Sequence, residues 1–575
     1  MPVQNIEIAW ALDALADLSE LDGDNPYRVR AYRTAARTIS QLEEPLHLWV
    51  GADADLTELP GVGSEIAAKI REIVQTHRLG TLERLAERVP LSLRELLALP
   101  GVGSKQVRTL HAELGLATLA ELIEALDDGR VEGLRGFGAK RVRQLREAAE
   151  RELTREPRWR IDVAEQLSRP LIEDLRSHDA IEDVDATGSL RRRRETIGDV
   201  DLLVVAPRPD EAADLIVAHE DVVEPIERDA LGVKARFRSG LPLEARIVTS
   251  DLTGIALIHG TGSSGHKDAL KGRARTQGLD LRDDGLFRDD ELVAADSEDA
   301  VYAALGLDGI PPELREGRGE IDAAARHDLP DLITIGDIRG DLQMHTTASD
   351  GENTLAEMAQ AARARGYAYI AITDHSQRMR VANGLSPERL REQMGTIDAL
   401  NAEDEDDVVV LKSCEVDILA DGTLDLPDDV LEALDLVVVS VHSKFDLSRA
   451  AQTERICRAL EHPLVNVLAH PTGRIVNRRD PYDVDIERVI ASAVENDVWL
   501  EINASPQRLD LKDNHVRLAK EMGARFVIST DAHRASGLGL MRHGVDQARR
   551  GWLSAADVVN TRDWPTFRER IRRAR

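Results

Sequence analysis

The sequence of 575 residues contains only two cysteines, Cys414 and Cys457. Two cysteines cannot build the disulfide framework of a small secreted scaffold, so they indicate a reducing compartment. No uninterrupted apolar run is long enough to cross a bilayer, and the N-terminus lacks the basic-then-apolar pattern of a signal peptide. We therefore expect a cytoplasmic protein that does not associate with membranes.

Lysine is also scarce: ten lysines stand beside 64 arginines, and the net charge is −30. This composition suits a halophilic cytoplasm at molar salt, where the Debye length is about 3 Å and self-repulsion is screened. A GC-rich genome also favours arginine over lysine, so both explanations stay open. The negative charge does not exclude nucleic acid, because local basic patches and backbone amides bind phosphate.

A chain of this length exceeds a single hydrophobic core, so several domains are expected, with α+β and α/β architecture. Glycine-broken helical patterns come first, mixed strands and helices follow, and short β-branched strands alternating with helices fill the last part. We predict two helical domains over 1–88 and 89–155, a mixed domain over 156–250, a smaller one over 251–315, a charged linker over 316–336 and a barrel over 337–575.

Two nearly identical turns, Gly61-Val-Gly63 and Gly101-Val-Gly103, each precede a helical pattern, and a looser third copy lies at 136–138. The glycines permit a tight turn, and the unpaired amides at the start of the next helix can bind phosphate. One such turn is equally explained as a simple loop, whereas two copies favour contact with the DNA backbone. They resemble the helix-hairpin-helix motif of DNA repair proteins, which implies DNA binding through Gly61, Gly63, Gly101, Gly103 and Lys105.

A second constellation begins at Gly188-Ser189 and continues to Asp199 and Asp201. Aspartates two residues apart on a strand point to the same side and can hold two divalent ions. The Gly-Ser pair lets a backbone amide and a hydroxyl approach phosphate, and neighbouring arginines supply charge. In isolation the two aspartates are better explained as a solvated strand end.

The order of helical turns, Gly-Ser, Gly-Asp-Xaa-Asp and Thr261-Gly262-Ser263 resembles the family X DNA polymerases of the polymerase beta type. The resemblance implies a nucleotidyltransferase palm over 156–250, a thumb over 251–315, and filling of gapped or nicked DNA with dNTPs by a monomer. It also implies Mg²⁺ or Mn²⁺ held by Asp199, Asp201 and Glu244. The residues implied for nucleotide binding are Gly188, Ser189, Arg191, Arg192, Thr261, Gly262 and Ser263.

The chain departs from that family at several positions. The third carboxylate is Glu244 instead of aspartate, and its extra methylene predicts slower catalysis. Arg193 replaces a glycine, and His259-Gly260 replaces a tyrosine-phenylalanine pair that packs near the sugar, which predicts weak sugar discrimination.

Lys69 matches the family lysine that forms a Schiff base with abasic sites, which implies a catalytic lyase role. A lysine on this turn that simply contacts phosphate is at least as good an explanation. Glu65 stands where a second lysine is common, and a nearby acid does not favour the neutral amine that attacks aldehydes.

In the last part of the chain, apolar runs repeatedly stop at residues that bind metals. The pattern predicts about seven buried parallel strands, and a parallel barrel collects the C-terminal ends of its strands on one face. Histidines and acids at those ends would converge and build a hydrolytic site with several metal ions. The four runs that show this most clearly are 369–375, 436–442, 465–470 and 525–533.

This part resembles the PHP (polymerase and histidinol phosphatase) domains, which implies a distorted (β/α)7 barrel with two or three Mn²⁺, Zn²⁺ or Fe²⁺ ions. Such ions polarise a phosphoryl oxygen and activate water. Lys444 and Arg474 follow ligand positions and would bind phosphate. Gln343 replaces a family histidine and predicts weaker binding of one ion. The implied ligands are His345, Asp350, His375, Glu415, His442, His470, Asp531 and His533.

The leading hypothesis is a DNA repair polymerase with a 3′-5′ exonuclease or 3′-end phosphoesterase in the barrel. One alternative is a DNA-end nuclease or phosphatase whose polymerase half only holds DNA, which the departures at 244, 259 and 260 favour. A non-catalytic DNA-binding adaptor is a second alternative. A phosphatase of small molecules is disfavoured because it has no use for the helical turns.

Overall fold

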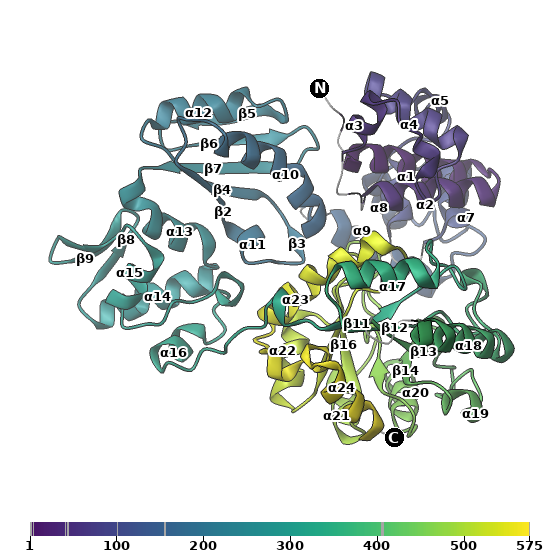
Figure 1. The fold of residues 1–575 in the computed structure, drawn as a ribbon. Helices are drawn as coiled ribbons and strands as arrows, with labels where there is room; N and C mark the ends of the chain where they lie inside the picture. Colours follow the sequence, from purple (N-terminus) through teal and green to yellow (C-terminus); the bar gives the residue numbers. More distant parts are fainter. Residues whose placement is uncertain are drawn as a thin grey trace. The chain divides into compact units, whose positions relative to one another are not determined.

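The computed structural model describes residues 3, 5–40, 42, 45–99, 102–153, 157–403 and 408–573. By internal packing the chain divides into two compact units, 1–158 and 159–575 (Figure 1). Within the described ranges, every helix is too short or too polar to cross a lipid bilayer.

The first unit is helical and has its own hydrophobic core around α1 (Asn5–Asp22). Ile8, Leu12, Leu15 and Leu18 recur every three or four residues and are fully buried, as expected for the inner face of a helix. Its remaining described helices are α2 (Pro26–Ser40), α3 (Leu46–Gly51), η1 (Leu56–Glu58), α4 (Ser64–Thr76), α5 (Gly80–Ala86), α6 (Leu93–Leu97), α7 (Ser104–Leu114), α8 (Leu119–Asp127) and α9 (Ala139–Leu153).

The second unit begins with a five-stranded sheet in the order β2-β4-β7-β6-β5. Strands β4 and β7 are parallel and the other pairs are antiparallel. Helices α10 and α12 pack on this sheet (Figure 1). The elements are β1 (Trp159–Arg160), α10 (Ile161–Arg176), β2 (Asp183–Ala186), α11 (Gly188–Arg191), β3 (Thr196–Ile197), β4 (Val200–Val205), α12 (Pro209–Ala218), β5 (Val222–Asp229), β6 (Gly232–Phe237) and β7 (Pro242–Val248).

The next segment packs helices against a small antiparallel sheet in the order β10-β9-β8. Ile255, Ile258, Leu270 and Tyr302 are buried at its centre. Its elements are η2 (Ser250–Leu252), α13 (Thr253–Thr261), α14 (Ser264–Thr276), β8 (Asp280–Arg282), β9 (Gly285–Arg288), β10 (Glu291–Ala294), α15 (Glu298–Ala304) and η3 (Pro312–Leu314).

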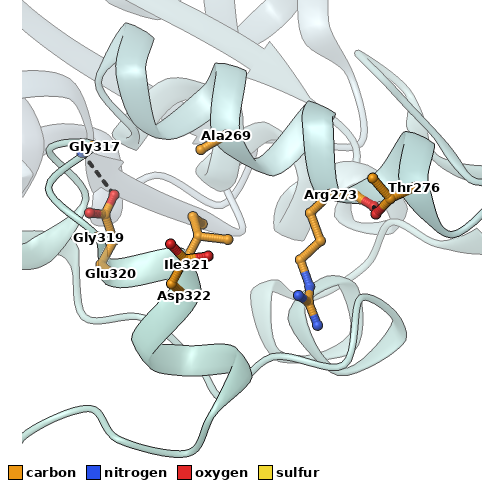
Figure 2. A pocket seen from close by; sticks show the side chains of 8 residues that line it. All are labelled: Ala269, Arg273, Thr276, Gly317, Gly319, Glu320, Ile321 and Asp322. Carbon is orange, nitrogen blue, oxygen red and sulfur yellow. Dashed lines mark hydrogen bonds between the residues drawn. The ribbon is translucent and has the colours of Figure 1, made fainter.

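Residues 316–336, which the sequence suggests as a linker, contain α16 (Glu320–Ala325) and the first two residues of η4 (Ile335–Asp337). Glu320 is fully buried, accepts a hydrogen bond from the Gly317 amide at 2.8 Å and lies 2.7 Å from His266 Nδ1. The segment is therefore folded onto α14, and a pocket lies between α14 and α16 (Figure 2). The residues described around this pocket do not include those that the sequence suggests for either active site.

The rest of the second unit is a barrel of seven parallel strands in sequential order. Strand β11 also pairs with the residues after β17 through a parallel bridge between Met344 and Ala532, which closes the barrel. The expected barrel is confirmed. Its strands are β11 (Gly340–Met344), β12 (Tyr369–Ile372), β13 (Val409–Asp417), β14 (Leu436–Ser440), β15 (Val467–Leu468), β16 (Trp499–Asn503) and β17 (Phe526–Ser529).

Each barrel strand is followed by at least one helix, and these helices surround the strands (Figure 1). This alternation of parallel strands and helices places the C-terminal strand ends on one face. The helices are α17 (Leu355–Ala364), η5 (Arg380–Ala382), α18 (Pro387–Glu403), α19 (Asp428–Leu431), α20 (Arg449–Leu460), α21 (Ile486–Glu495), α22 (Asp513–Glu521), η6 (Ala535–Leu540), α23 (Met541–Arg550), η7 (Ala555–Asp557), η8 (Val559–Thr561) and α24 (Trp564–Arg573).

Two candidate active sites

Three carboxylates meet near the starts of β4 and β7. Asp201 and Glu244 are register partners on these parallel strands, and Asp199 lies two residues before Asp201. Burial, followed by the charges of Asp199 and Glu244, raises the pKa of Asp201 to about 7. A divalent cation removes such repulsion between acids, so this arrangement favours cation binding. The structure thus brings together the three acids suggested by the sequence.

The turn at Gly188 lies directly against these acids. Its φ is +56°, and a Cβ atom at this position would lie 1.7 Å from Asp201 Oδ2. Glycine is therefore required both by the backbone conformation and by the lack of space. The hydroxyl of Ser189 is buried and makes no hydrogen bond within the described structure. It remains available next to the turn.

Arg191 and Arg192 connect the Gly-Ser turn to the Thr-Gly-Ser segment. Arg191 donates to Thr261 Oγ1 at 2.8 Å and forms an ion pair with Glu298 at 2.8 Å. Arg192 donates to the Thr261 carbonyl at 2.7 Å and forms an ion pair with Glu316 at 3.1 Å. Both candidate nucleotide-binding segments are therefore joined, with their arginines already paired to carboxylates.

The Thr-Gly-Ser segment joins α13 to α14: Thr261 ends α13, and Ser263 is the N-cap of α14. Ser263 Oγ caps this helix by accepting a hydrogen bond from the His266 amide at 3.2 Å. A Cβ atom at Gly262 would approach His266 Cδ2 to 2.7 Å, which explains the glycine. His259, at the position of a family aromatic residue, is buried, and its Nε2 lies 3.0 Å from the Arg282 carbonyl.

The helical turns of the first unit have the geometry expected from the sequence where they are described. Gly61 has a φ of +74°, and Gly63 and Gly103 are the N-caps of α4 and α7. Lys105 is exposed at the start of α7. Gly101 lies outside the described residues. The amides at the two helix starts can therefore face a phosphate backbone.

Lys69 lies on α4, the helix that follows the Gly61-Val-Gly63 turn. Its Nζ is 2.8 Å from Glu65 Oε1 and 5.7 Å from the centre of the Tyr32 ring. The Tyr32 hydroxyl donates to the same carboxylate oxygen at 3.0 Å. The candidate lyase nucleophile is thus held in an ion pair.

In the barrel, Glu415 on β13 is the centre of a cluster of four histidines. Its Oε1 lies 2.8 Å from His470 Nε2 and 3.3 Å from His442 Nε2. Its Oε2 lies 3.1 Å from His375 Nδ1 and 3.5 Å from His345 Nε2. Glu415 is fully buried. One carboxylate therefore faces ligand atoms on two sides, as a ligand shared between two cations does.

Two further acids extend the cluster. Asp350 lies 3.6 Å from both His375 Nε2 and His533 Nε2, and Asp531 lies 3.2 Å from His345 Nε2. The structure thus brings all eight suggested ligands together. Two sets have ligand atoms within 4.8 Å of one another: His345, Asp350, His375 and His533, and His375, Glu415 and His442.

The acids of this cluster attract positive charge. Burial lowers the pKa of His442, but Glu415 and Asp417 more than offset it and raise the value to about 9. At His375, burial and the neighbouring histidines lower the pKa to about 3. Divalent ions would supply the positive charge in place of protons, while leaving the imidazoles neutral for coordination.

Several buried residues that the sequence analysis missed orient these ligands. Asp417 lies 2.9 Å from His442 Nδ1, and Glu501 accepts a hydrogen bond from the His470 amide at 2.5 Å. Asn503 donates to Asp531 Oδ2 at 3.1 Å. Such partners fix the orientation of metal ligands. The two-residue spacing of Asp417 from Glu415 on β13 was a signal that would have found one of them.

The cations near the cluster differ from those expected. Arg474 is buried, forms an ion pair with Glu195 at 2.8 Å and donates to the Leu509 carbonyl, so it is engaged elsewhere. Lys444 is exposed. Arg508, which the sequence analysis missed, has its Nε 3.2 Å from Asp531 Oδ2 and thus lies beside a ligand.

Gln343 lies on β11, two residues before His345, and its backbone carbonyl accepts a hydrogen bond from the Asp531 amide at 3.0 Å. It is 1% exposed, and neither its amide oxygen nor its nitrogen has a hydrogen-bond partner among the described residues. A buried, unpaired amide is costly, and a cation can accept its oxygen as a ligand. The mixed nitrogen and oxygen donors of the cluster therefore fit Mn²⁺, Zn²⁺ or Fe²⁺.

Family models match four parts of the chain. A "Helix-hairpin-helix domain" matches residues 3–79, and a "SAM-like Helix-hairpin-helix tandem" matches 93–151. A "DNA polymerase beta thumb" matches 256–316, and a "PHP domain" matches 341–505.

Curated relatives match nearly the whole chain or slightly more than a third of it. "DNA polymerase/3'-5' exonuclease PolX" of Bacillus subtilis (strain 168) is 38% identical over 560 residues, 97% of each chain. A "Probable phosphatase" of Thermoanaerobacter sp. (strain X514) is 31% identical over 235 residues, 38% of this chain and 90% of the relative. A "Probable phosphatase" of Caldanaerobacter subterraneus is 31% identical over 204 residues, 34% of this chain and 75% of the relative.

Proposed function

The chain belongs to the family X DNA polymerases that carry a C-terminal PHP domain, and on that premise we propose a DNA repair enzyme with two active sites. The palm fills short gaps by template-directed nucleotidyl transfer, and the barrel acts as a 3′-5′ exonuclease or 3′-end phosphoesterase. The observation that carries the proposal is the pairing, in one chain, of a three-carboxylate site with a cluster of eight histidines and acids.

In the palm, Asp199, Asp201 and Glu244 would hold Mg²⁺ or Mn²⁺. Ions bound there would activate a 3′-hydroxyl and neutralise a triphosphate. Gly188, having no side chain, keeps the approach to Asp201 open. The free hydroxyl of Ser189 and the guanidinium group of Arg192 would bind the triphosphate oxygens of a dNTP.

In the barrel, the ligands around Glu415 would hold two or three ions, which would polarise a phosphoryl oxygen and activate water. Asp417, whose Oδ1 lies 2.9 Å from His442 Nδ1, would hold this imidazole in one orientation and keep a proton on its Nδ1. Arg508 and Lys444 would bind the non-bridging oxygens of the phosphate ester, because Arg474 is already paired with Glu195. A phosphate bound beside the ligands would meet the exposed Lys444 and Arg508, whose Nε lies 3.2 Å from Asp531 Oδ2.

The helix starts at Gly63 and Gly103 would bind the DNA backbone through amides, which suits a chain with few lysines. Salt adaptation and a cytoplasmic location are part of the same proposal. The low lysine content supports the first, and the two free, buried cysteines support a reducing compartment. A monomer is the simplest assembly that holds both sites.

A labelled primer on a one-nucleotide gap, in high KCl with Mn²⁺, tests the proposal with and without dNTPs. We expect extension with dNTPs and 3′ degradation without them. Asp199→Ala should abolish extension only, and His470→Ala should abolish degradation only. Extension that persists in Asp199→Ala would overturn the palm assignment, and a wild type that does neither would reject the whole proposal.

A second candidate function is removal of a terminal 3′-phosphate by the barrel, with a slow or inactive palm. It is favoured by the phosphatase names of the barrel relatives and by Glu244 in place of aspartate. The same assay on a primer ending in 3′-phosphate measures it. Phosphate release that depends on His470, without any extension in the unblocked gap, would favour this alternative.

Schiff-base lyase chemistry at Lys69 is a further part of the proposal. Borohydride trapping on DNA with an abasic site tests it, with Lys69→Ala beside the wild type. An adduct found only with the wild type supports the role, and no adduct with either protein ends it.

A further inference from the structure

The last residue of barrel helix α23, Arg550, reaches into the loop of the palm that follows the Gly-Ser turn. Its Nη1 donates to the Arg192 carbonyl at 2.6 Å and to Glu316 Oε1 at 3.0 Å. Its Nη2 donates to Asp513 Oδ2 at 2.6 Å, at the start of barrel helix α22. Arg550 is 4% exposed. A buried guanidinium group with three partners is fixed in position.

Glu316 links Arg550 to the side chain of Arg192. The same oxygen, Oε1, accepts from Arg192 Nε at 3.1 Å and from Arg550 Nη1, while Oε2 accepts from Arg194 at 3.3 Å. Burial raises the pKa of Glu316, but Arg550 and Arg192 lower it below the usual value, so the carboxylate stays charged. Arg550 therefore holds Arg192 at two points, its carbonyl and, through Glu316, its guanidinium group.

The chain of contacts ends in the nucleotide site. Arg192 Nη1 donates to the Thr261 carbonyl at 2.7 Å. Asp513, Arg550, Glu316, Arg192 and Thr261 thus form one continuous series from the barrel to the Thr-Gly-Ser segment. Salt screens buried pairs much less than exposed ones, so the series persists at high ionic strength.

We propose that Arg550 is a positioning residue for nucleotide binding, which holds the Arg192 loop from the barrel in the orientation that meets the triphosphate of a dNTP. This inference rests on the polymerase function proposed above. It assigns the barrel a role in polymerisation that is separate from its own hydrolytic cluster.

The preceding residue provides a matched control. Arg549 also leaves the end of α23, with its Nε 2.8 Å from Glu313 Oε1 and its Nη1 2.9 Å from the Ile333 carbonyl. Neither Glu313 nor Ile333 belongs to the palm loop. Arg549→Met therefore removes a comparable arginine bridge from the same helix without touching Arg192.

The experiment compares Arg550→Met, Arg550→Lys and Arg549→Met with the full-length wild type, each checked for thermal unfolding. In gap filling, we expect Arg550→Met to raise KM for dATP about tenfold while kcat changes less. The reason is that a displaced Arg192 loop weakens nucleotide binding but leaves the carboxylates of the chemical step in place. Arg550→Lys should restore little, since one ammonium group cannot replace the planar fork. The 3′ degradation rate should stay within about twofold of the wild type.

Hydrogen exchange supplies a readout that does not depend on catalysis. Amides 189–194 should exchange faster in Arg550→Met than in Arg549→Met, because local exchange reports local opening. Equal exchange, or a fall in kcat at unchanged KM, would overturn the positioning role and leave a general structural one. If the wild type does not extend a primer, the proposed polymerase fails, and the exchange comparison alone decides whether Arg550 holds the loop.

Discussion

Asp201 and Glu244 lie opposite one another on the parallel strands β4 and β7. They form the second residue pair of this pairing, next to the strand end at which Asp199 lies. The extra methylene of Glu244 moves its carboxylate outward relative to an aspartate at the same place. We predict that Glu244→Asp raises kcat of gap filling about tenfold or more, because misplacement of about an ångström has a large effect on rate.

Primer-extension rates at saturating dNTP measure this change, with Glu291→Asp on β10 as the control. A Glu244→Asp variant slower than the wild type would show that this palm is built around the longer side chain.

A substitution at Gly188 tests how closely the Gly-Ser turn approaches the carboxylate of Asp201. Gly188→Ala combines a left-handed φ with a Cβ atom 1.7 Å from Asp201 Oδ2, so we predict loss of extension by at least about a hundredfold. Gly278 also has a positive φ, +69°, but open space around it. Gly278→Ala should therefore lose only about 1 kcal/mol of stability and keep its activity. Equal activity in the two variants would contradict the close approach.

Glu415 is the shared carboxylate of the barrel cluster. We predict that Glu415→Gln lowers the bound metal by at least one ion per chain, measured by elemental analysis after dialysis, and reduces 3′ degradation by about a hundredfold or more. Extension should be unchanged. Glu461→Gln, an exposed glutamate at the end of α20, is the control. Full metal content in Glu415→Gln would remove it from the ligand set.

Gln343 is buried, its backbone carbonyl accepts from the amide of Asp531, and its side-chain amide has no hydrogen-bond partner among the described residues. Imidazole binds Mn²⁺, Zn²⁺ and Fe²⁺ more tightly than a neutral amide oxygen does, so we predict that Gln343→His raises the bound metal toward three ions per chain. Elemental analysis across a series of chelator concentrations measures the gain. An unchanged ion count would mean that Gln343 already serves as a ligand or that this position stays outside the site.

We expect the ion pair of Asp513 with Arg550, at the contact of barrel and palm, to lose its contribution to stability at acid pH. Burial alone would raise the pKa of Asp513, but Arg550 and Arg318 lower it to about 2 from the ordinary 3.8. A lowered pKa in the folded state adds stability above about pH 4, and this contribution disappears as the pH falls through about 2. We predict that the wild type loses about 2 kcal/mol more unfolding free energy between pH 5 and pH 2 than Asp513→Asn does.

Denaturant titrations at both pH values, at constant ionic strength, measure the difference. Asp183→Asn, an exposed aspartate of β2, serves as the comparison and should behave as the wild type. Parallel losses in the wild type and Asp513→Asn would contradict the sign of the shift.

The barrel and its metal cluster could be predicted from the sequence. His375, His442 and His470 follow the C-terminal ends of strands, and these ends share one face in a parallel barrel. The palm acids were also within reach, since strand spacing sets the direction of Asp199 and Asp201 and the family pattern marks Glu244. In each case the relevant information is local, and strand periodicity converts it into position.

Contacts between residues distant in the chain could not be predicted in this way. Arg474 was suggested as a phosphate ligand, and only the tertiary structure shows that Glu195, far away in sequence, already holds it. Arg550 gave no signal at all, because its role depends on where helix α23 meets the palm. Strand periodicity determines which way a side chain points, and the sequence contains that periodicity. Packing between distant segments decides which residues the side chain contacts, and only the tertiary structure shows this packing.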